Sequence, residues 1–190
     1  MGFFGLISQF VTKKNNAMNK SSLPKEAYDQ YYATYLSQLD DNDLMVLLKS
    51  GKTEFTKFIE GIKAEKLKIA YGKGKWTIAE VILHVIDAER IFQYRALRFL
   101  RNDKTTLPGF DQDQYVLHSN ANIRSRKSLI TEFNSVRDAS ITLFQSLGKE
   151  DLMRKGIASN IEWTVATLGF VICGHLRHHQ KILSSRYLLI

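Results

Sequence analysis

Apolar side chains recur at intervals of three and four residues along four long segments of the chain, which is the spacing of one face of an α-helix. In the first segment, residues 41–68, such a face begins with Leu44, Leu47, Leu48 and Phe55. No segment shows a convincing strand alternation. The pattern therefore predicts an all-α protein, an up-down four-helix bundle with an extra N-terminal helical segment. The other predicted helices cover residues 75–103, residues 122–148, residue 164 almost to the C-terminus, and a short tyrosine-rich stretch at residues 25–38.

Local signals mark where these helices begin and how they are connected. Thr77 is a good N-cap residue and Glu80 stands three positions later, so the second helix is predicted to begin with a capping box. Gly148 is the stop signal of the third helix. Residues 104–121, between the second and third helices, are too long for a tight hairpin, and connections of this length are often functional.

This long connection carries polar side chains of its own. Asp111, Asp113 and Tyr115 could close over a site, although such residues more often serve turns and helix caps. His118, in the same connection, has no partner that the sequence reveals. We therefore assign no chemistry to the connection from the sequence.

The bulk composition narrows the class of protein without pointing to a partner. The chain has 190 residues, of which 44% are hydrophobic and 24% charged, an ordinary mixture for one globular domain with a sizeable core. Its formal net charge is +8, which raises the question of nucleic-acid binding. Lysines and arginines are scattered and interleaved with acids, so a solvated mixed surface explains the charge better, and we expect no nucleic-acid partner.

The sequence also bears on membrane association and on the redox compartment. No apolar run approaches 18 residues, so we expect neither a membrane span nor a membrane partner. The single cysteine, Cys173, cannot form an internal disulfide, which agrees with a cytoplasmic location. Near the N-terminus, Lys13 and Lys14 follow an apolar stretch instead of preceding it, so a secretory signal is not indicated. Residues 1–17 are expected to be a flexible leader or extension, and residues 18–190 to form a single helical-bundle domain.

Three of the five histidines fall in one stretch near the C-terminus, "GHLRHHQKIL". Apolar residues of the fourth helix follow steps of three and four, and this seam places His175 and His179 at core positions. His178 is about 100° from His179 around the helix and falls off the seam. Two of the three imidazoles are therefore predicted to face the bundle core, and the third to face sideways.

The second helix offers one more inward histidine. His84 lies on the line formed by Val81, Ala88 and Ile91. Three inward imidazoles from two helices suit Zn, Ni, Fe or Mn, and three protein ligands leave an open position, as in catalytic sites. A lone core histidine is more often hydrogen-bonded than metal-bound, and a His-x-x-x-His pair also occurs by chance. Three buried imidazoles nevertheless need hydrogen-bond partners or an ion.

These motifs resemble the DinB-like superfamily of metal-binding four-helix bundles, which includes the YfiT-like hydrolases and thiol S-transferases. The resemblance covers about residues 41–188. It rests on the Trp-Thr-x-x-Glu-x-x-x-His-x-x-Asp pattern of "GKWTIAEVILHVIDAERIFQYRALRF", on "LPGFDQDQY", and on the closing His-x-x-x-His of "GHLRHHQKIL". It implies that His84, His175 and His179 match the three metal-ligand positions. It also implies the same bundle fold and a homodimer.

Two functional interpretations follow. In the first, the protein is an enzyme whose divalent transition metal activates either a low-molecular-weight thiol for S-transfer or water for hydrolysis of a small-molecule substrate. In the alternative, it is a non-catalytic, metal-stabilised bundle that acts as a stress-related binding module. Asp87 could accept the outer N–H of an imidazole and fix its orientation, or pair as an exposed acid with Arg90 or Arg95. Arg90, Arg95 and Arg98 could meet an anionic thiol or line a solvated face.

Overall fold

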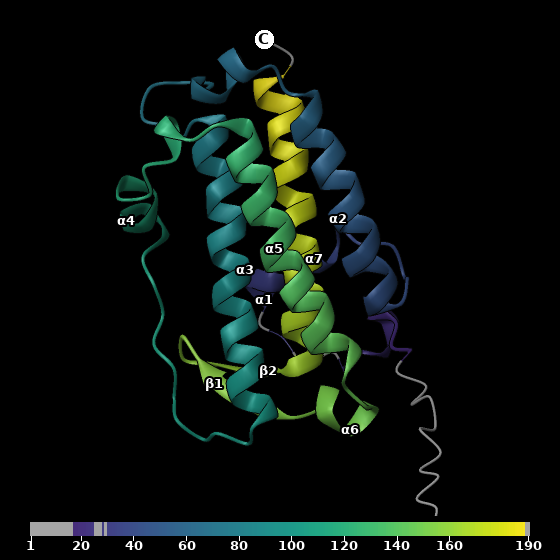
Figure 1. Cartoon of the computed structure of the whole chain (residues 1–190). Coiled ribbons are helices and arrows are strands. Elements are labelled where there is room, and N and C mark those ends of the chain that lie inside the picture. The colour runs from purple at the N-terminus through teal and green to yellow at the C-terminus, as the bar shows by residue number, and fades with distance from the viewer. Residues whose placement is uncertain (1–16, 25–27, 29, 189–190) are drawn as a thin grey trace, which may run out of the picture.

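The computed structural model describes residues 17–24, 28 and 30–188, and four long helices make up nearly half of this part of the chain (Figure 1). The predicted all-α four-helix bundle is confirmed. The expectation for residues 1–17 lies, apart from Ala17, outside the described residues. The long helices are α2 (Leu44–Gly61), α3 (Ile78–Leu100), α5 (Arg126–Gln145) and α7 (Val165–Ile182).

Shorter elements connect and cover the bundle. α1 (Gln30–Leu36) packs against α7 and lies within the helix predicted over residues 25–38, which ends two residues earlier than predicted. α4 (Gln112–Leu117) packs against α3, and α6 (Lys149–Leu152) follows α5. None of the helices in the described residues combines the length and apolar character that crossing a membrane requires. Within the same part of the chain, 3-10 turns cover Lys20–Ser22, Ala64–Lys68 and Ala121–Ile123, and a π-helical turn, Leu183–Tyr187, continues α7.

The starts of the helices follow from the local sequence. The Glu80 backbone N–H donates to Thr77 Oγ1 at 3.2 Å, and the Thr77 N–H donates to the Glu80 carboxylate at 2.7 Å, so the predicted capping box is present. Thr164 caps α7 by accepting a hydrogen bond from the N–H of Thr167 at 3.0 Å. Gly148 stands just beyond the end of α5, where it begins α6. The caps on α3 and α7 fix where the two histidine-bearing helices begin.

The four long helices are not arranged around the bundle in chain order. α3 packs against α5 and α7, and α2 packs against the same two helices, so the consecutive helices α2 and α3 lie diagonally (Figure 1). α3 and α5 run parallel, because the pairs Glu89–Arg137 and Gln93–Ser140 advance along both helices together. α3 and α7 run in opposite directions (Figure 1). Along the chain, the long helices therefore run up, down, down and up, so the bundle is present but the alternating up-down order predicted from the sequence is not.

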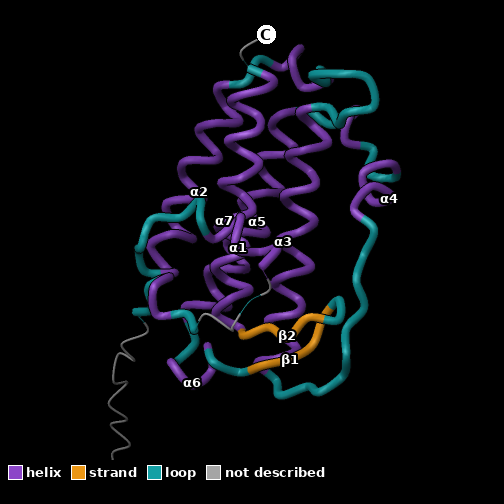
Figure 2. Tube along the Cα trace, turned by 180° about the vertical axis from the view of Figure 1, so that it is seen from behind, coloured by secondary structure: helices purple, strands orange, loops and turns teal. Residues whose placement is uncertain are grey.

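The long connection after α3 makes this arrangement possible. Residues 101–125 run back along the outside of the bundle, so α5 begins at the same end as α3 (Figures 1 and 2). A helix of 23 residues is about 35 Å long, which is the distance that the returning chain must cover. The connection is therefore too long for a tight hairpin for a structural reason. It must return along the bundle so that α3 and α5 can lie side by side in the same direction.

A short β-hairpin precedes α7. β1 (Lys155–Ala158) pairs antiparallel with β2 (Ile161–Thr164) (Figure 2). The sequence shows no convincing strand alternation here, because strands of four residues are too short for the alternation to be recognised. Ser159 and Asn160 have positive φ angles of 53° and 61°, as a two-residue hairpin turn requires. The fully buried side chain of Trp163 anchors the hairpin to the core.

A charged pair lies buried where α3 and α5 meet. Arg137 is fully buried and Glu89 is 2% exposed. Arg137 Nε donates to Glu89 Oε1 at 2.7 Å, and Arg137 Nη2 donates to Glu89 Oε2 at 2.8 Å. Ser140 Oγ donates to Glu89 at 2.8 Å, and Arg137 Nη1 donates to the Leu48 carbonyl at 3.2 Å. This network joins α2, α3 and α5 inside the core, where both charges are shielded from water.

Candidate metal centre

Three imidazoles meet between α3 and α7. His84 lies near the start of α3, and His175 and His179 lie about one turn apart on α7. Nε2 of His175 is 3.1 Å from Nε2 of His84 and 3.1 Å from Nε2 of His179. The ligand atoms of all three residues lie within 4.8 Å of one another. The structure thus brings together the three histidines that the helical seams place at core positions.

Hydrogen bonds among the rings cannot satisfy this cluster. A neutral imidazole nitrogen carries either one hydrogen or one lone pair, so His175 Nε2 can form a hydrogen bond with only one of its two neighbours. The buried Nδ1 atom of His179 has no hydrogen-bond partner among the described residues. That Nδ1 atom lies on the other edge of the ring and does not bear on the convergence point. The Nε2 atom that its neighbours leave unpaired costs free energy when buried, so the arrangement calls for a further group where the Nε2 atoms converge.

A divalent transition metal fits the donor set at that point. Imidazole nitrogens bind Zn²⁺ at about 2.0–2.1 Å, so two of them at a tetrahedral angle lie about 3.3 Å apart. The two Nε2 separations of 3.1 Å are close to this value. Neutral nitrogen donors also suit Ni, Fe and Mn, so the donor set indicates a class of ion and does not choose among its members. Three protein ligands would leave a coordination position open for a small molecule.

Burial keeps these imidazoles neutral. Removal from water lowers the pKa of His84 from 6.5 to about 4. The pKa of His179 is lowered to about 2 by burial, with smaller effects from His84 and His178. Burial, followed by the proximity of His179 and His84, also holds the pKa of His175 well below its usual value. Neutral imidazole is the form that binds a metal, so the side chains are prepared for coordination over a wide pH range.

Aromatic side chains hold two of the rings in place. The Trp76 ring lies 4.9 Å from the ring of His84, and the Tyr35 ring lies 5.2 Å from that of His175. Tyr35 belongs to α1, which approaches α7 very closely at Gly174. A Cβ atom on Gly174 would lie 2.4 Å from the Tyr35 carbonyl oxygen, so only glycine admits α1 at this distance. Neither aromatic contact was predicted from the sequence. Trp76 lies only eight residues before His84, whereas Tyr35 is distant along the chain from the histidines.

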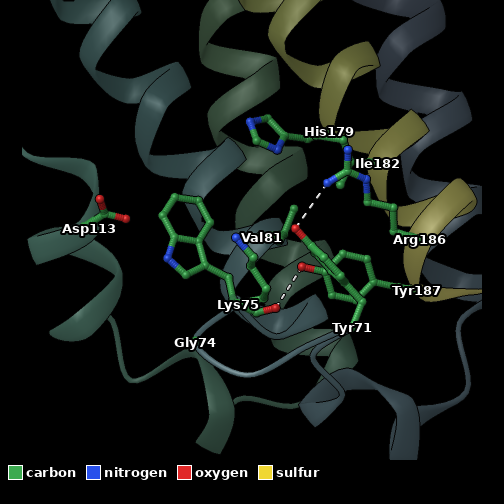
Figure 3. Close-up of a pocket in the computed structure, with 10 residues that line it drawn as sticks. Tyr71, Gly74, Lys75, Val81, Asp113, His179, Ile182, Arg186 and Tyr187 are labelled. Carbon is green, nitrogen blue, oxygen red and sulfur yellow. Dashed lines mark hydrogen bonds between the residues drawn. The ribbon is translucent and has the colours of Figure 1, made fainter.

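A pocket of about 240 Å³ opens beside His179 (Figure 3). The side chains come from the loop before α3, from α3 itself, from α4, from the end of α7 and from the π-helical turn that follows it. His179 is the histidine of the cluster that lines this pocket, so a small molecule bound there would lie next to the candidate metal centre. The other lining residues are Tyr71, Gly74, Lys75, Trp76, Val81, Asp113, Ile182, Arg186 and Tyr187.

The structure places the remaining predicted residues around the cluster. Asp87 Oδ1 lies 3.3 Å from Arg90 Nη1, and within the described part of the chain no hydrogen bond joins Asp87 to an imidazole. Asp87 thus forms an ion pair with Arg90 while its side chain is half-buried. Asp113 reaches the pocket, whereas Asp111 caps α4 by accepting from the Asp113 N–H at 2.9 Å. His178 lies beside Tyr35, off the cluster, as its position on the helix predicts.

The three arginines considered as contacts for an anion are engaged elsewhere. Arg90 also pairs with Glu132 at 2.6 Å, Arg95 donates to the Ser159 hydroxyl at 2.8 Å, and Arg98 pairs with Asp103. The cations that line the pocket are Lys75 and Arg186, which sequence reasoning missed. Lys75 adjoins the Trp-Thr motif and could have been noticed. Arg186 could not, because the π-helical turn that carries it leaves no periodic signal.

Tyr115 and His118 lie away from the candidate metal centre. Together with Asp87 and Arg90 they line a second depression, between α3 and α4. His118 is exposed at the end of α4. Neither residue therefore closes over the histidine cluster in this structure, and His118 offers a matched histidine control outside it.

Comparison with protein families gives one match that covers most of the chain. The family model of the DinB superfamily matches residues 47–183. All three clustered histidines fall inside the matched region, whereas α1 and its Tyr35 lie outside it.

Two individual proteins are similar to this chain. A protein of Oceanobacillus iheyensis named "Putative metal-dependent hydrolase" is 24% identical over 122 residues, which are 64% of this chain and 70% of that protein. The solved structure of YfiT from Bacillus subtilis, described as "a probable metal-dependent hydrolase with an unusual four-helix bundle topology", has a TM-score of 0.63 at 16% identity. That match covers 86% of this chain and 92% of YfiT, and at this identity it shows a shared fold.

Proposed function

The chain belongs to the DinB superfamily, and from this premise we propose that it is a metal-dependent hydrolase that acts on a small-molecule substrate. One observation carries the proposal. The Nε2 atoms of His84, His175 and His179 converge at a buried point, and the three rings cannot satisfy one another there. The name of the relative from Oceanobacillus iheyensis supports hydrolysis as the reaction class.

In this proposal His84, His175 and His179 hold the ion, and a divalent ion on three neutral imidazoles supplies Lewis-acid activation of water. Trp76 and Tyr35 keep the ligand rings in orientation and shield them from solvent on two sides. The pocket beside His179 leads a substrate toward the cluster without exposing His84 or His175, which are 4% and 5% exposed. The protein thus positions the reacting groups and excludes bulk water from them.

A thiol S-transferase would use the same three ligands, with a low-molecular-weight thiol in place of water. We retain it as the second reaction to be tested, because the cluster itself does not separate the two. A non-catalytic, metal-stabilised bundle is the further alternative. The homodimer that the family resemblance implies stays a prediction, to be checked by light scattering on the full chain.

The proposed function predicts hydrolysis that depends on an added ion and on His84. Metal-free protein should be loaded in turn with Zn²⁺, Ni²⁺, Fe²⁺ and Mn²⁺ and assayed with a panel of small esters, amides and phosphate esters. A thiol with an electrophile is assayed alongside. His84→Ala should lower the rate by more than about 100-fold, because a ligand is lost outright, whereas removal of an outer-shell partner already costs 10–100-fold.

His118→Ala is the matched control and should retain activity, since His118 is exposed and outside the cluster. Activity with the thiol and electrophile alone would replace the hydrolase with the transferase. A protein that binds one equivalent of metal and turns over neither class of substrate would support the non-catalytic bundle and contradict the proposal.

A further inference from the structure

Two cationic side chains face the pocket beside His179. Lys75 and Arg186 approach it from different segments, the loop before α3 and the π-helical turn after α7 (Figure 3). In the described part of the chain neither side chain forms an ion pair, whereas Arg90 and Arg98 are paired with acids. Both charges are therefore available to an anion that enters the pocket.

The position of Arg186 is fixed by its neighbour on the pocket wall. Its guanidinium lies over the ring of Tyr71, 5.5 Å from the centroid, and its Nη1 atom donates to the Tyr71 hydroxyl at 3.2 Å. A guanidinium has five N–H donors, so this contact leaves others for a ligand. The Tyr187 hydroxyl donates to the Trp76 carbonyl at 2.8 Å, which ties the π-helical turn to the loop that carries Lys75. The two cations are thus held on a common frame.

The charge around the pocket also favours an anionic ligand. Residues 63–75, which end at the pocket, contain five lysines and one acid, Glu65. Asp113 is the one carboxylate among the residues described as lining the pocket, against the two cations Lys75 and Arg186. An excess of one sign of charge around a cleft raises the local concentration of ligands of the opposite sign. The rest of the wall is largely apolar and aromatic, from Tyr71, Trp76 and Tyr187.

Resting on the proposed function, we propose that the substrate is a small organic anion. Lys75 and Arg186 bind its carboxylate or phosphate group, and its apolar or aromatic body lies against Trp76 and Tyr71. The part that reacts lies toward His179. The pocket volume of about 240 Å³ is below the range typical of drug-sized ligands, so the substrate is small.

Binding to metal-free protein tests this inference apart from the hydrolase proposal. The probes are phenylacetate and phenyl phosphate as anions, 2-phenylethanol as a neutral ligand and phenethylamine as a cation. Tryptophan fluorescence reports binding, because Trp76 lines the pocket while Trp163 is fully buried elsewhere in the core. The anions should bind about tenfold more tightly than 2-phenylethanol, and their binding should weaken with added salt. The anion inference is overturned if the neutral or cationic probe binds as tightly as the anions, or if no probe binds.

Substitutions test which side chains are responsible for anion binding. Lys75→Gln and Arg186→Gln should each weaken anion binding by about tenfold, the loss of one charge-assisted contact. Lys73→Gln is the matched control, an exposed lysine two residues from Lys75 that does not line the pocket. Asp113→Asn should tighten anion binding a few-fold, because it removes the acid from the wall. Arg186→Lys should restore part of the affinity lost in Arg186→Gln.

The outcomes of the two proposals can be told apart. Anion binding that is unchanged in Lys75→Gln and Arg186→Gln, with unfolding temperatures equal to that of the parent, overturns the anion site and leaves the metal centre in place. Selective anion binding by a protein that takes up no metal supports the anion site and contradicts the hydrolase.

Discussion

Replacing Arg137 by methionine is expected to lower the free energy of unfolding by about 3–5 kcal/mol. Glu89 is 2% exposed, and the substitution would leave its charge buried without the bidentate partner it has at 2.7 and 2.8 Å. The hydroxyl of Ser140 would stay as its remaining described donor. Urea denaturation of the metal-free protein, followed by circular dichroism, measures this loss without a contribution from the candidate metal centre.

An exposed ion pair between α2 and α5 gives the matched control. Lys52 Nζ lies 2.6 Å from Asp138 Oδ1, with side chains that are 30% and 57% exposed. Asp138→Asn should cost less than about 1 kcal/mol, because water screens this pair. The double substitution Glu89→Gln with Arg137→Met should recover part of the loss, since it removes both charges. Equal costs for Arg137→Met and Asp138→Asn would show that the buried pair does not hold α3 to α5.

Acid is expected to destabilise the metal-free protein between pH 6.5 and about pH 4. In the unfolded chain the clustered histidines titrate near pH 6.5, whereas in the folded protein the pKa of His84 is about 4. Below pH 6.5 the unfolded state therefore binds more protons, and stability falls with falling pH. For His84 alone the loss by pH 4 is about 3 kcal/mol, from 1.36 kcal/mol per pKa unit. His175 and His179 act in the same direction.

Urea denaturation at several pH values from 7 to 4 measures this dependence. Carboxylates also titrate near the lower limit, so the informative quantity is the difference between the parent and His84→Gln. The variant should lose less stability over this range than the parent. A parent and a His84→Gln variant with the same pH dependence would contradict the account of burial given for His84.

Helix positions and the histidine cluster could be predicted because both depend on local periodicity. The seam of α7 places His175 and His179 inward, and the capping box of Thr77 and Glu80 fixes the start of α3 and hence the depth of His84. On α3 the residues predicted to face the core are buried at His84 but not at every position. Ile91 is half-buried, and the buried face continues through its neighbour Phe92.

The arrangement of helices could not be predicted in the same way. Four amphipathic helices are compatible with several orders and directions, and the parallel packing of α3 and α5 depends on contacts such as Glu89 with Arg137. Both helices carry several other charged residues, and one of them, Arg95, is also buried, so composition alone does not identify Glu89 and Arg137 as partners. Besides α3 and α7, the pocket is likewise built from the loop before α3, from α4 and from the π-helical turn, which only the folded chain brings together.

The central claim is that His84, His175 and His179 hold a divalent metal, and its most direct test is the metal content of tag-free protein by elemental mass spectrometry. The account predicts about one equivalent of transition metal in the parent after incubation with Zn²⁺, Ni²⁺, Fe²⁺ or Mn²⁺. It predicts a content near zero in His175→Ala/His179→Ala that remains folded by circular dichroism. A folded parent that takes up no metal under these conditions, or a double variant that keeps it, would contradict the claim.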